Sequence, residues 1–271
     1  MPEAALRADL HLHSTASDGL MPPADVALAA SSAGLAVAAL TDHDTCAGFP
    51  DFAAAAARCG LVALCGAEVA AEQAGEEVHL LAYFRRPPAG GYRALLEQLA
   101  AARPARALEM VRRLRAMGYP IEADAVLGRP RPGRPHVARA LVAAGVVEDP
   151  TEAFRRFLTP GAPAYVPRWR PLAADVIALA HGDGGLVALA HPRRSGGDRV
   201  EELAAAGLDA LEVVHPSADR SAQAELAAQA AEFGLLATGG SDFHAKDDDP
   251  PLGRWCLGGA ALARFLARLP A

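Results

Sequence analysis

Apolar positions along the chain follow two alternating patterns. Short, nearly continuous apolar runs predict buried strands, and alanine-rich stretches with helical periodicity predict the helices between them. The strands are expected at residues 8–12, 36–40, 61–69, 77–84, 185–190, 209–214 and 234–238. The helices are expected at residues 23–34, 47–59, 91–117, 172–182, 199–206, 218–233 and 259–268, with a break in the third at Pro104.

Repeated strand–helix units predict an α/β protein with a parallel sheet that is closed or doubly wound. Between residues 101 and 170, Pro- and Gly-rich segments separate short helical patterns. We therefore expect a barrel domain from residues 1–100 and 171–271, and a small, mainly helical insertion from residues 101–170. The length of 271 residues suits one barrel-sized domain with such an insertion.

Composition narrows the class of protein. Hydrophobic residues make up 52% of the chain, which excludes a disordered protein. A net charge of −6 disfavours a broad nucleic-acid-binding face, so no DNA duplex is expected as a partner. No apolar run reaches the roughly 18 residues of a membrane span, and the N-terminus has no signal-peptide core. We expect a cytoplasmic protein without a membrane or an obligatory protein partner.

Histidine and acidic residues collect at the ends of the predicted strands. In parallel α/β folds, active sites form at the carboxyl ends of the strands. Several separate segments therefore deliver metal-ligand side chains to one expected edge. The candidate ligands are His11, His13, Asp18, His43, Glu68, His79, His191, Asp242 and His244.

Each of these segments is ambiguous when it is taken alone. His11 and His13 are alternate residues of a strand and can face one ion, but such a pair also occurs on surfaces and in cores. Glu68 ends an otherwise apolar strand, where an unpaired carboxylate is costly and no Lys or Arg is near in sequence. A His in an apolar run, such as His79, is more often a satisfied core residue. Together, however, the nine side chains favour a metal site.

The chemistry of this set indicates which metals are expected. Six His and three carboxylates, without Cys, suit Mn²⁺, Fe²⁺ or Zn²⁺ better than cations that prefer all-oxygen shells. Nine ligands are too many for one ion, so we expect two to three divalent ions, with Mn²⁺ first and Fe²⁺, Zn²⁺ or Mg²⁺ as alternatives. Multinuclear sites are typical of phosphoester hydrolysis, because the metals activate a water and clamp the phosphoryl oxygens.

In order along the chain, the motifs HxHxxxxD, TDHD, GxE, an isolated His, AHP and SDFH resemble the PHP (polymerase and histidinol phosphatase) family. The resemblance implies a distorted (β/α)7 barrel with a trinuclear metal centre. It implies three ligand sets, namely His11, His13, Glu68 and Asp242; Glu68, His79 and His191; and Asp18, His43 and His244. The side chains expected in the reaction itself are Asp18, His43, Glu68, His191, Asp242 and His244.

The segments 133–139 and 158–166 resemble a subgroup of this family with a small helical insertion. The resemblance implies action on nucleoside 3′,5′-bisphosphates or on the 5′ ends of short RNA. The side chains expected to bind substrate, from these segments, from an AHPxR pattern and from the end of a predicted strand, are Arg134, His136, Arg194, His215 and Ser217. Arg134 could instead only cap a helix with His136 packed inside the insertion, and His215 is as readily structural as functional.

The first hypothesis is a phosphoesterase that removes the 3′-phosphate of nucleoside 3′,5′-bisphosphates with a metal-activated hydroxide. Alternatives with the same site are a 5′→3′ exoribonuclease on short RNA and a phosphatase of histidinol-phosphate type. A non-catalytic metal-binding module is disfavoured because no candidate ligand is lost, and hydrolysis of C–N bonds is disfavoured by the arginines. The expected partner is a small phosphorylated substrate, either a nucleotide or a short RNA.

Overall fold

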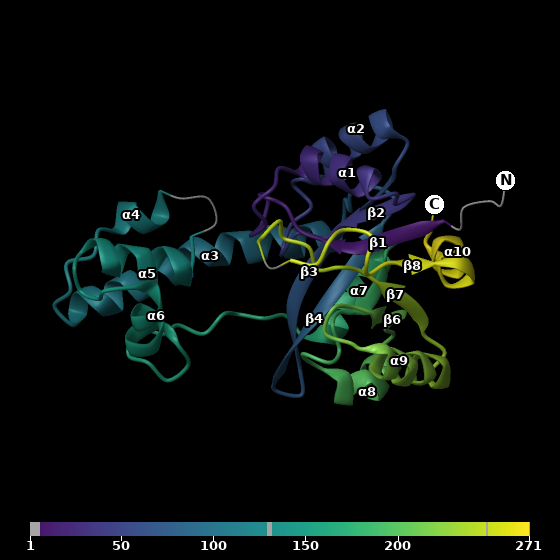
Figure 1. Ribbon diagram of the computed structural model, residues 1–271. Helices are drawn as coiled ribbons and strands as arrows, with labels where there is room; N and C mark the ends of the chain where they lie inside the picture. The colour runs from purple at the N-terminus through teal and green to yellow at the C-terminus, as the bar shows by residue number, and fades with distance from the viewer. Residues whose placement is uncertain (1–5, 129–131, 248, 271) are drawn as a thin grey trace. The chain divides into compact units, whose positions relative to one another are not determined.

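The chain forms two compact units in the computed structural model (Figure 1). Residues 6–128, 132–247 and 249–270 are described. The first unit is Met1–Ala94 with Arg170–Ala271, and the second is Leu95–Trp169. None of the described helices is both long and apolar enough to cross a membrane.

The first unit is built on one eight-stranded sheet with the spatial order β7-β6-β5-β4-β3-β2-β1-β8. The strands are β1 (Arg7–Leu12), β2 (Val37–Leu40), β3 (Val62–Gln73), β4 (Glu76–Phe84), β5 (Leu186–Leu189), β6 (Ala210–Val214), β7 (Leu236–Gly239) and β8 (Leu257–Gly258). Every predicted strand is present. The pattern did not predict β8, because two residues are too few to show a periodicity.

The sheet is mixed, so the predicted all-parallel arrangement is wrong. The pairs β1–β2, β2–β3, β5–β6 and β6–β7 are parallel, whereas β3–β4, β4–β5 and β1–β8 are antiparallel. A tight turn with Ala74 (φ 51°) and Gly75 (φ 83°) joins β3 directly to β4. So short a connection allows only an antiparallel pair, because parallel strands need a crossover.

The segment that follows β7 nearly closes the sheet into a barrel. The backbone N–H of Asp242 donates to the His11 carbonyl (3.0 Å), and the N–H of His13 donates to the Phe243 carbonyl (2.9 Å). In Figure 1 this yellow segment runs beside β1. The strands therefore form the distorted α/β barrel that the sequence predicted, and the segment after β7 brings its side chains to the end of β1.

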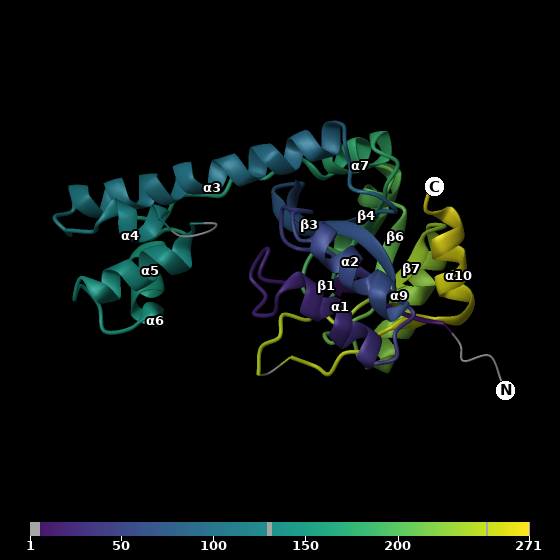
Figure 2. The same ribbon diagram turned by 90° about the horizontal axis from the view of Figure 1, so that it is seen from above.

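Helices lie outside the strands of the first unit (Figure 2). They are α1 (Pro23–Ser32), α2 (Phe49–Cys59), α7 (Ala173–Gly182), α8 (Val200–Ala205), α9 (Arg220–Glu232) and α10 (Gly259–Arg268). Inside the barrel, Leu10, Leu64, Leu81 and Tyr83 belong to one buried core. This core fixes the strands, and the strands fix the side chains at their carboxyl ends.

The second unit is helical, with α3 (Gly91–Ala116) running on from the first. The shorter helices are α4 (Ala123–Leu127), α5 (Arg134–Ala143), α6 (Pro150–Ala153) and a π-helical turn at Phe154–Leu158. The predicted break at Pro104 is wrong, since α3 continues through it. Proline removes one backbone hydrogen bond, but the neighbouring alanines favour helix, and Ala107 and Met110 are anchored in the buried core of this unit.

Candidate metal centre

Side chains from the ends of five strands and from the loops between them meet in the first unit. Among the described residues there are four groups in which the ligand atoms of all members lie within 4.8 Å of one another. One of them is His11, Glu212 and His215, and the other three contain the ligands expected from the sequence. The first group is His11, His13, Glu68 and Asp242; the second is Glu68, His79 and His191; the third is His13, Asp18, His43 and His244. These groups contain all nine ligands expected from the sequence, and His13 belongs to two of them.

Glu68 lies at the centre of the three groups, with its side chain 1% exposed. Its Oε2 lies 3.3 Å from His11 Nε2, 3.3 Å from His13 Nε2 and 3.1 Å from His43 Nδ1, and its Oε1 lies 2.7 Å from His79 Nδ1 and 3.0 Å from His191 Nε2. Burial opposes ionisation, but attraction to His43 and His11 outweighs it and holds the pKa of Glu68 well below its usual value. The carboxylate is therefore an anion placed to bridge several cations.

Asp242 completes the first group from the segment after β7. Its Oδ1 lies 3.5 Å from His11 Nε2 and 3.4 Å from His13 Nε2. Its backbone adopts φ 56°, and the preceding Gly240 passes so close to β1 that a Cβ there would lie 2.4 Å from the His11 Cβ. Glycine is required at that position to let the segment reach the site.

His13 provides the test of whether a metal fits. Both of its ring nitrogens are buried, and neither makes a hydrogen bond to the described residues. The facing oxygens of Glu68 and Asp242 lie 3.3 and 3.4 Å from Nε2, longer than an ordinary N–H···O bond. Burial disfavours the cationic ring, but these two carboxylates outweigh it and raise the pKa of His13 to about 9. Buried nitrogens without partners that face carboxylates form a donor set that suits a divalent cation.

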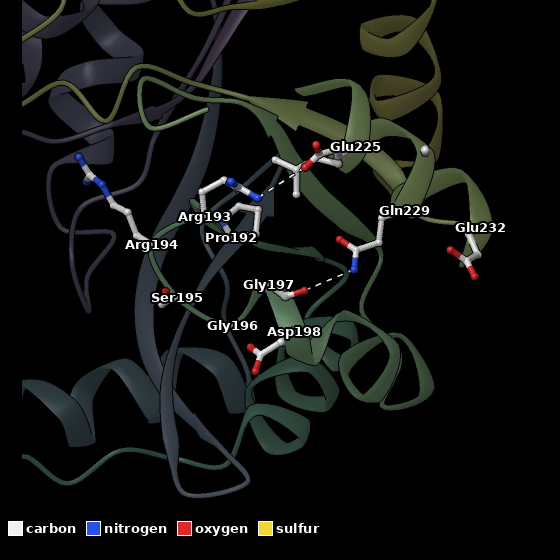
Figure 3. Close-up of a pocket in the computed structure, with 12 residues that line it drawn as sticks. Pro192, Arg193, Arg194, Ser195, Gly196, Gly197, Asp198, Glu225, Gln229 and Glu232 are labelled. Carbon is white, nitrogen blue, oxygen red and sulfur yellow. Dashed lines mark hydrogen bonds and ion pairs between the residues drawn. The ribbon is translucent and has the colours of Figure 1, made fainter. Parts of the chain in front are cut away.

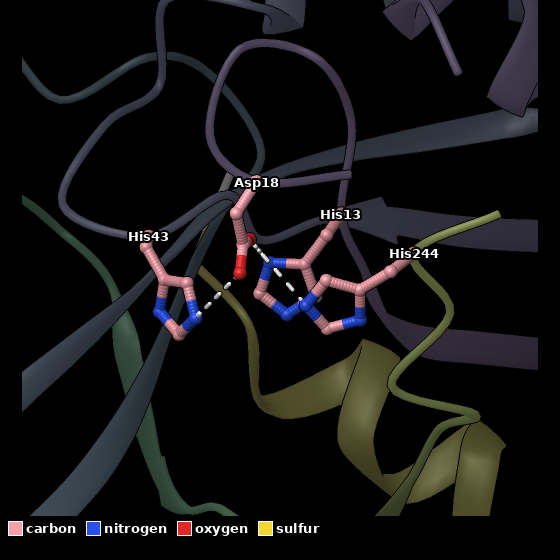
Figure 4. A group of neighbouring side chains, drawn as sticks. All are labelled: His13, Asp18, His43 and His244. Carbon is pink, nitrogen blue, oxygen red and sulfur yellow. Dashed lines mark ion pairs between the residues drawn. The ribbon is translucent and has the colours of Figure 1, made fainter. Parts of the chain in front are cut away.

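Figure 4 shows the third group, in which the Asp18 carboxylate faces the rings of His43 and His244. Asp18 Oδ1 lies 3.4 Å from His244 Nε2, and Asp18 Oδ2 lies 3.9 Å from His43 Nε2. The Asp18 side chain is 51% exposed. Burial opposes its ionisation, but contact with His244 and attraction to His43 lower the pKa of Asp18. Burial lowers the pKa of His43 to about 4, so this ring is neutral and able to bind a metal.

His79 belongs to the second group and contacts two carboxylates, those of Glu68 and Glu77. Its Nδ1 faces Glu68, while its Nε2 lies 3.1 Å from Glu77 Oε1, and Glu77 pairs with Arg170. Burial disfavours the charged ring, but the bonds to Glu68 and Glu77 raise the pKa of His79 to about 9. A carboxylate on the second ring nitrogen is a common way to orient a metal-binding His. Both ring nitrogens of His79 thus have a carboxylate partner, so this geometry is compatible with a metal ligand and also with a satisfied structural histidine.

Two acidic residues that the ligand prediction did not include form hydrogen bonds to residues of the site or of its loops. Glu212 is fully buried; its Oε1 lies 3.0 Å from His11 Nδ1, and its Oε2 accepts the His191 N–H at 2.6 Å. Asp42 accepts the Ser14 N–H (2.8 Å) and the Ser14 hydroxyl (2.7 Å) at the base of the loop that carries Asp18. The signal for Glu212 was available, since it is an acid inside an apolar strand, as is Glu68.

Three of the five expected substrate-binding residues lie around Asp242. Arg194 Nη1 lies 2.9 Å from Asp242 Oδ2, and the Arg194 side chain is 55% exposed. His215 Nε2 lies 3.6 Å from the same oxygen. His215 Nδ1 accepts the Ser217 N–H at 3.0 Å, so in the neutral ring the proton sits on Nε2 and faces Asp242.

Arg194 also lines a surface pocket of about 800 Å³ between the segment after β5 and α9 (Figure 3). In this pocket Arg193 pairs with Glu225 at 3.6 Å, and Gln229 donates to the Gly197 carbonyl at 3.3 Å. In Figure 3 the Arg194 side chain extends away from the side chains of α9. Its guanidinium pairs with Asp242 and not with the side chains of α9.

Arg134 and His136 lie in the first turn of α5, in the second unit. The Arg134 guanidinium lies 5.7 Å from the Phe154 ring and 6.0 Å from the Tyr165 ring, and its Nη1 is 3.5 Å from the Leu158 carbonyl. The aromatic faces hold a cation in place without neutralising it. Both residues lie in the first turn of α5, but the N-cap of this helix is Gly133, and no side-chain hydrogen bond caps it.

The chain is similar to known proteins in sequence and in fold. The sequence matches the PHP domain over residues 9–111. It is 36% identical over 247 residues to a 3′,5′-nucleoside bisphosphate phosphatase from Chromobacterium violaceum, across 88% of this chain and 87% of that protein. It is 34% identical over 245 residues to a 5′-3′ exoribonuclease from Haemophilus influenzae, across 87% and 89% of the two chains. A solved structure from Bifidobacterium adolescentis, described as a metal-dependent phosphoesterase, matches with a TM-score of 0.80 and 35% identity over 99% and 98% of the two chains.

Proposed function

The chain belongs to the PHP family of metal-dependent phosphoesterases, and on that premise we propose that it removes the 3′-phosphate of nucleoside 3′,5′-bisphosphates. The observation that carries the proposal is the contact between Arg194 and Asp242 at the rim of the metal centre. It places the exposed guanidinium of Arg194 beside a candidate metal ligand. A phosphate bound to the metals would therefore also contact this guanidinium. The sequence similarity to a bisphosphate phosphatase over most of the chain supports the choice of substrate.

The three groups around Glu68 would hold two to three divalent ions, with Mn²⁺ as the first candidate. When bound, such ions would supply Lewis-acid chemistry and an activated water for attack on phosphorus. The protein's own contribution is to fix the ligands, since Glu68, His11 and His13 are all buried. Glu68 lies in β3, whereas His11 lies in β1 and His13 directly follows it. Rigid ligands hold the site in its reactive geometry before substrate arrives.

Arg194 and His215 would bind the phosphate that reacts. Arginine matches phosphate with two parallel N–H donors, and such charge-assisted bonds are stronger than neutral ones. His215 presents its Nε2 proton toward Asp242, beside the expected position of the phosphoryl oxygens. Ser217 holds this tautomer through its backbone N–H. Asp18, His43 and His244 would complete the more exposed side of the centre.

Arg134 and His136 would bind the second phosphate of the substrate. This role would give the insertion a function in selectivity, because a substrate with a further phosphate would gain a charged contact. Binding energy from a group remote from the reacting bond serves to position that bond. A bisphosphate would therefore be preferred over a monoester.

A 5′→3′ exoribonuclease is the second candidate, because a relative of that name is 34% identical to the chain. A short RNA with a 5′-phosphate offers the same two kinds of group, an anchoring phosphate and an ester bond. A phosphatase for small monoesters of histidinol-phosphate type would not need Arg134.

The four cysteines are unpaired, in keeping with our proposal of a cytoplasmic enzyme.

The test is phosphate release by the Mn²⁺-loaded protein from adenosine 3′,5′-bisphosphate, compared with 3′-AMP, histidinol phosphate and a 5′-phosphorylated RNA trimer. We expect kcat/KM for the bisphosphate to exceed that for 3′-AMP by at least about tenfold, the worth of one charged hydrogen-bonded contact. A higher kcat/KM for nucleotide release from the RNA trimer would favour the exoribonuclease. A higher kcat/KM for histidinol phosphate would overturn the nucleotide proposal.

A further inference from the structure

We propose that Glu212 is a positioning residue that couples the first and second metal-binding groups by holding one ligand from each. The inference rests on the metal centre proposed above. Glu212 lies in β6, and its side chain is 0% exposed. An acidic group in such a place needs partners, because a buried carboxylate without them is costly.

One oxygen of Glu212 sets the orientation of His11. The Glu212 Oε1 to His11 Nδ1 distance is 3.0 Å, so in the neutral ring Nδ1 carries the proton and donates it to Glu212. The lone pair of His11 then sits on Nε2. That atom lies 3.3 Å from Glu68 Oε2 and 3.5 Å from Asp242 Oδ1, inside the first group. Glu212 thus selects the tautomer that can bind a metal there.

The other oxygen of Glu212 fixes the backbone at His191. Oε2 accepts the His191 N–H at 2.6 Å, a short bond to a charged acceptor. His191 has a φ of 30°, which costs energy in a residue with a side chain. The bond offsets that cost and keeps His191 Nε2 3.0 Å from Glu68 Oε1, inside the second group.

Glu68 and Glu212 therefore act from opposite sides of the same two ligands. Glu68 faces His11 and His191 from the metal side, and Glu212 holds both residues from behind. The side chains that distinguish the third group, Asp18, His43 and His244, come from other loops. Loss of Glu212 should weaken two metal positions and spare the third.

The test variant is Glu212→Gln, which keeps the shape of the side chain. An amide has one acceptor oxygen, so it can accept from His11 Nδ1 or from the His191 N–H, and its NH₂ group then opposes the other donor. The metal-free proteins are titrated with Mn²⁺, and free Mn²⁺ is followed by its paramagnetic resonance signal. This readout counts bound ions and does not depend on activity.

We expect the wild-type protein to take up three ions. In Glu212→Gln, one ion should bind with nearly unchanged affinity and two should bind about 10–100-fold more weakly, as is usual when the partner of a metal-binding His is removed. The matched control is Asp42→Asn, a buried acid that holds the Asp18 loop through Ser14. It should give the converse pattern, with one position weakened and two retained.

A Glu212→Gln titration that overlays the wild type would overturn the inference. Equal weakening of all three positions in protein that retains wild-type circular dichroism would also overturn it, because it would show general loosening rather than selective coupling. If Glu212→Gln does not fold, Glu212→Asp is measured against the same expectation. A wild-type protein that takes up no Mn²⁺ would refute the metal centre itself, a result distinct from failure at Glu212 alone.

Discussion

Arg194 Nη1 lies 2.9 Å from Asp242 Oδ2. The pair joins an exposed cation to a carboxylate that also faces His11 and His13 from its other oxygen. Asp242 therefore faces two candidate metal ligands and also orients the arginine beside it. An incoming phosphate would find a donor fork already held in position, so little side-chain entropy would be lost on binding.

Replacing Arg194 by Ala should lower kcat/KM for adenosine 3′,5′-bisphosphate by about 10–100-fold, because a charged hydrogen bond to substrate contributes about 1.5–3 kcal/mol. Steady-state kinetics at saturating Mn²⁺ measures the loss. Arg194→Lys keeps the charge without the fork and should recover only part of the rate. The adjacent Arg193, which pairs with Glu225, is the matched control, and Arg193→Ala should stay close to wild type. Equal losses in both variants would remove the special role of Arg194.

Replacing Arg134 by Ala should act on one substrate and not on another. The KM for the bisphosphate should rise about tenfold or more, while hydrolysis of 3′-AMP, which lacks the 5′-phosphate, should change little. Arg139→Ala is the control, because Arg139 lies in the same helix α5 and donates to the Pro135 carbonyl within that helix. A parallel loss on both substrates would show that Arg134 supports the fold of the insertion and does not read a second phosphate.

His11→Ala and Asp242→Ala should each abolish measurable turnover while the protein stays folded. Both residues lie in the first group, but they are not part of the apolar core of the barrel. Phosphate release and circular dichroism on the same samples separate the two effects. His181→Ala, which breaks a pair with Asp209 outside the metal centre, should remain active. Near-wild-type turnover of Asp242→Ala with added Mn²⁺ would remove Asp242 from the centre.

The stability of the metal-free protein should decline as pH rises from about 6.5 toward 9, whereas below pH 6.5 the contributions of His43 and of buried Asp9, whose pKa is raised to about 7, oppose each other. The pKa values of His13 and His79 are raised to about 9 in the fold, so their contribution is complete below about 6.5 and is lost as pH rises toward 9. The pKa of His43 is lowered to about 4, so its contribution is lost as pH falls from 6.5 toward 4.

Thermal unfolding of the metal-free protein across pH 4–9 measures this profile. Saturating Mn²⁺ should remove the decline above pH 6.5, because metal ions bind deprotonated imidazoles and are favoured as pH rises. A Tm that climbs steadily from pH 6.5 to 9 without metal would contradict the account of His13 and His79.

The sequence predicts most of the strands and helices because each has its own local periodicity. It also predicts which nine side chains gather in the candidate metal centre, since all of them occur at or near strand ends. A local pattern does not show whether two neighbouring strands run parallel or antiparallel. The antiparallel course of β4 depends on the turn at Gly75 and on long-range pairing, and that register is what turns His79 toward Glu68.

Glu212 shows another limit of sequence reasoning. Both Glu68 and Glu212 are acids inside apolar strands, and burial makes each one a candidate for a cation partner. Only the folded barrel distinguishes them, because Glu68 faces the ring nitrogens of five histidines and Glu212 receives one ring N–H and one backbone N–H. Whether an acid binds metal or supports a ligand is set by neighbours far away in the chain.

The most direct test of the central claim is the identity of the nucleotide left after one phosphate is released from adenosine 3′,5′-bisphosphate. Phosphorus resonance spectra of the Mn²⁺-loaded reaction distinguish the two products. We predict 5′-AMP, formed with a stoichiometric amount of inorganic phosphate and not degraded further. Accumulation of 3′-AMP, or an unreacted bisphosphate beside rapid hydrolysis of histidinol phosphate, would contradict a 3′-phosphatase.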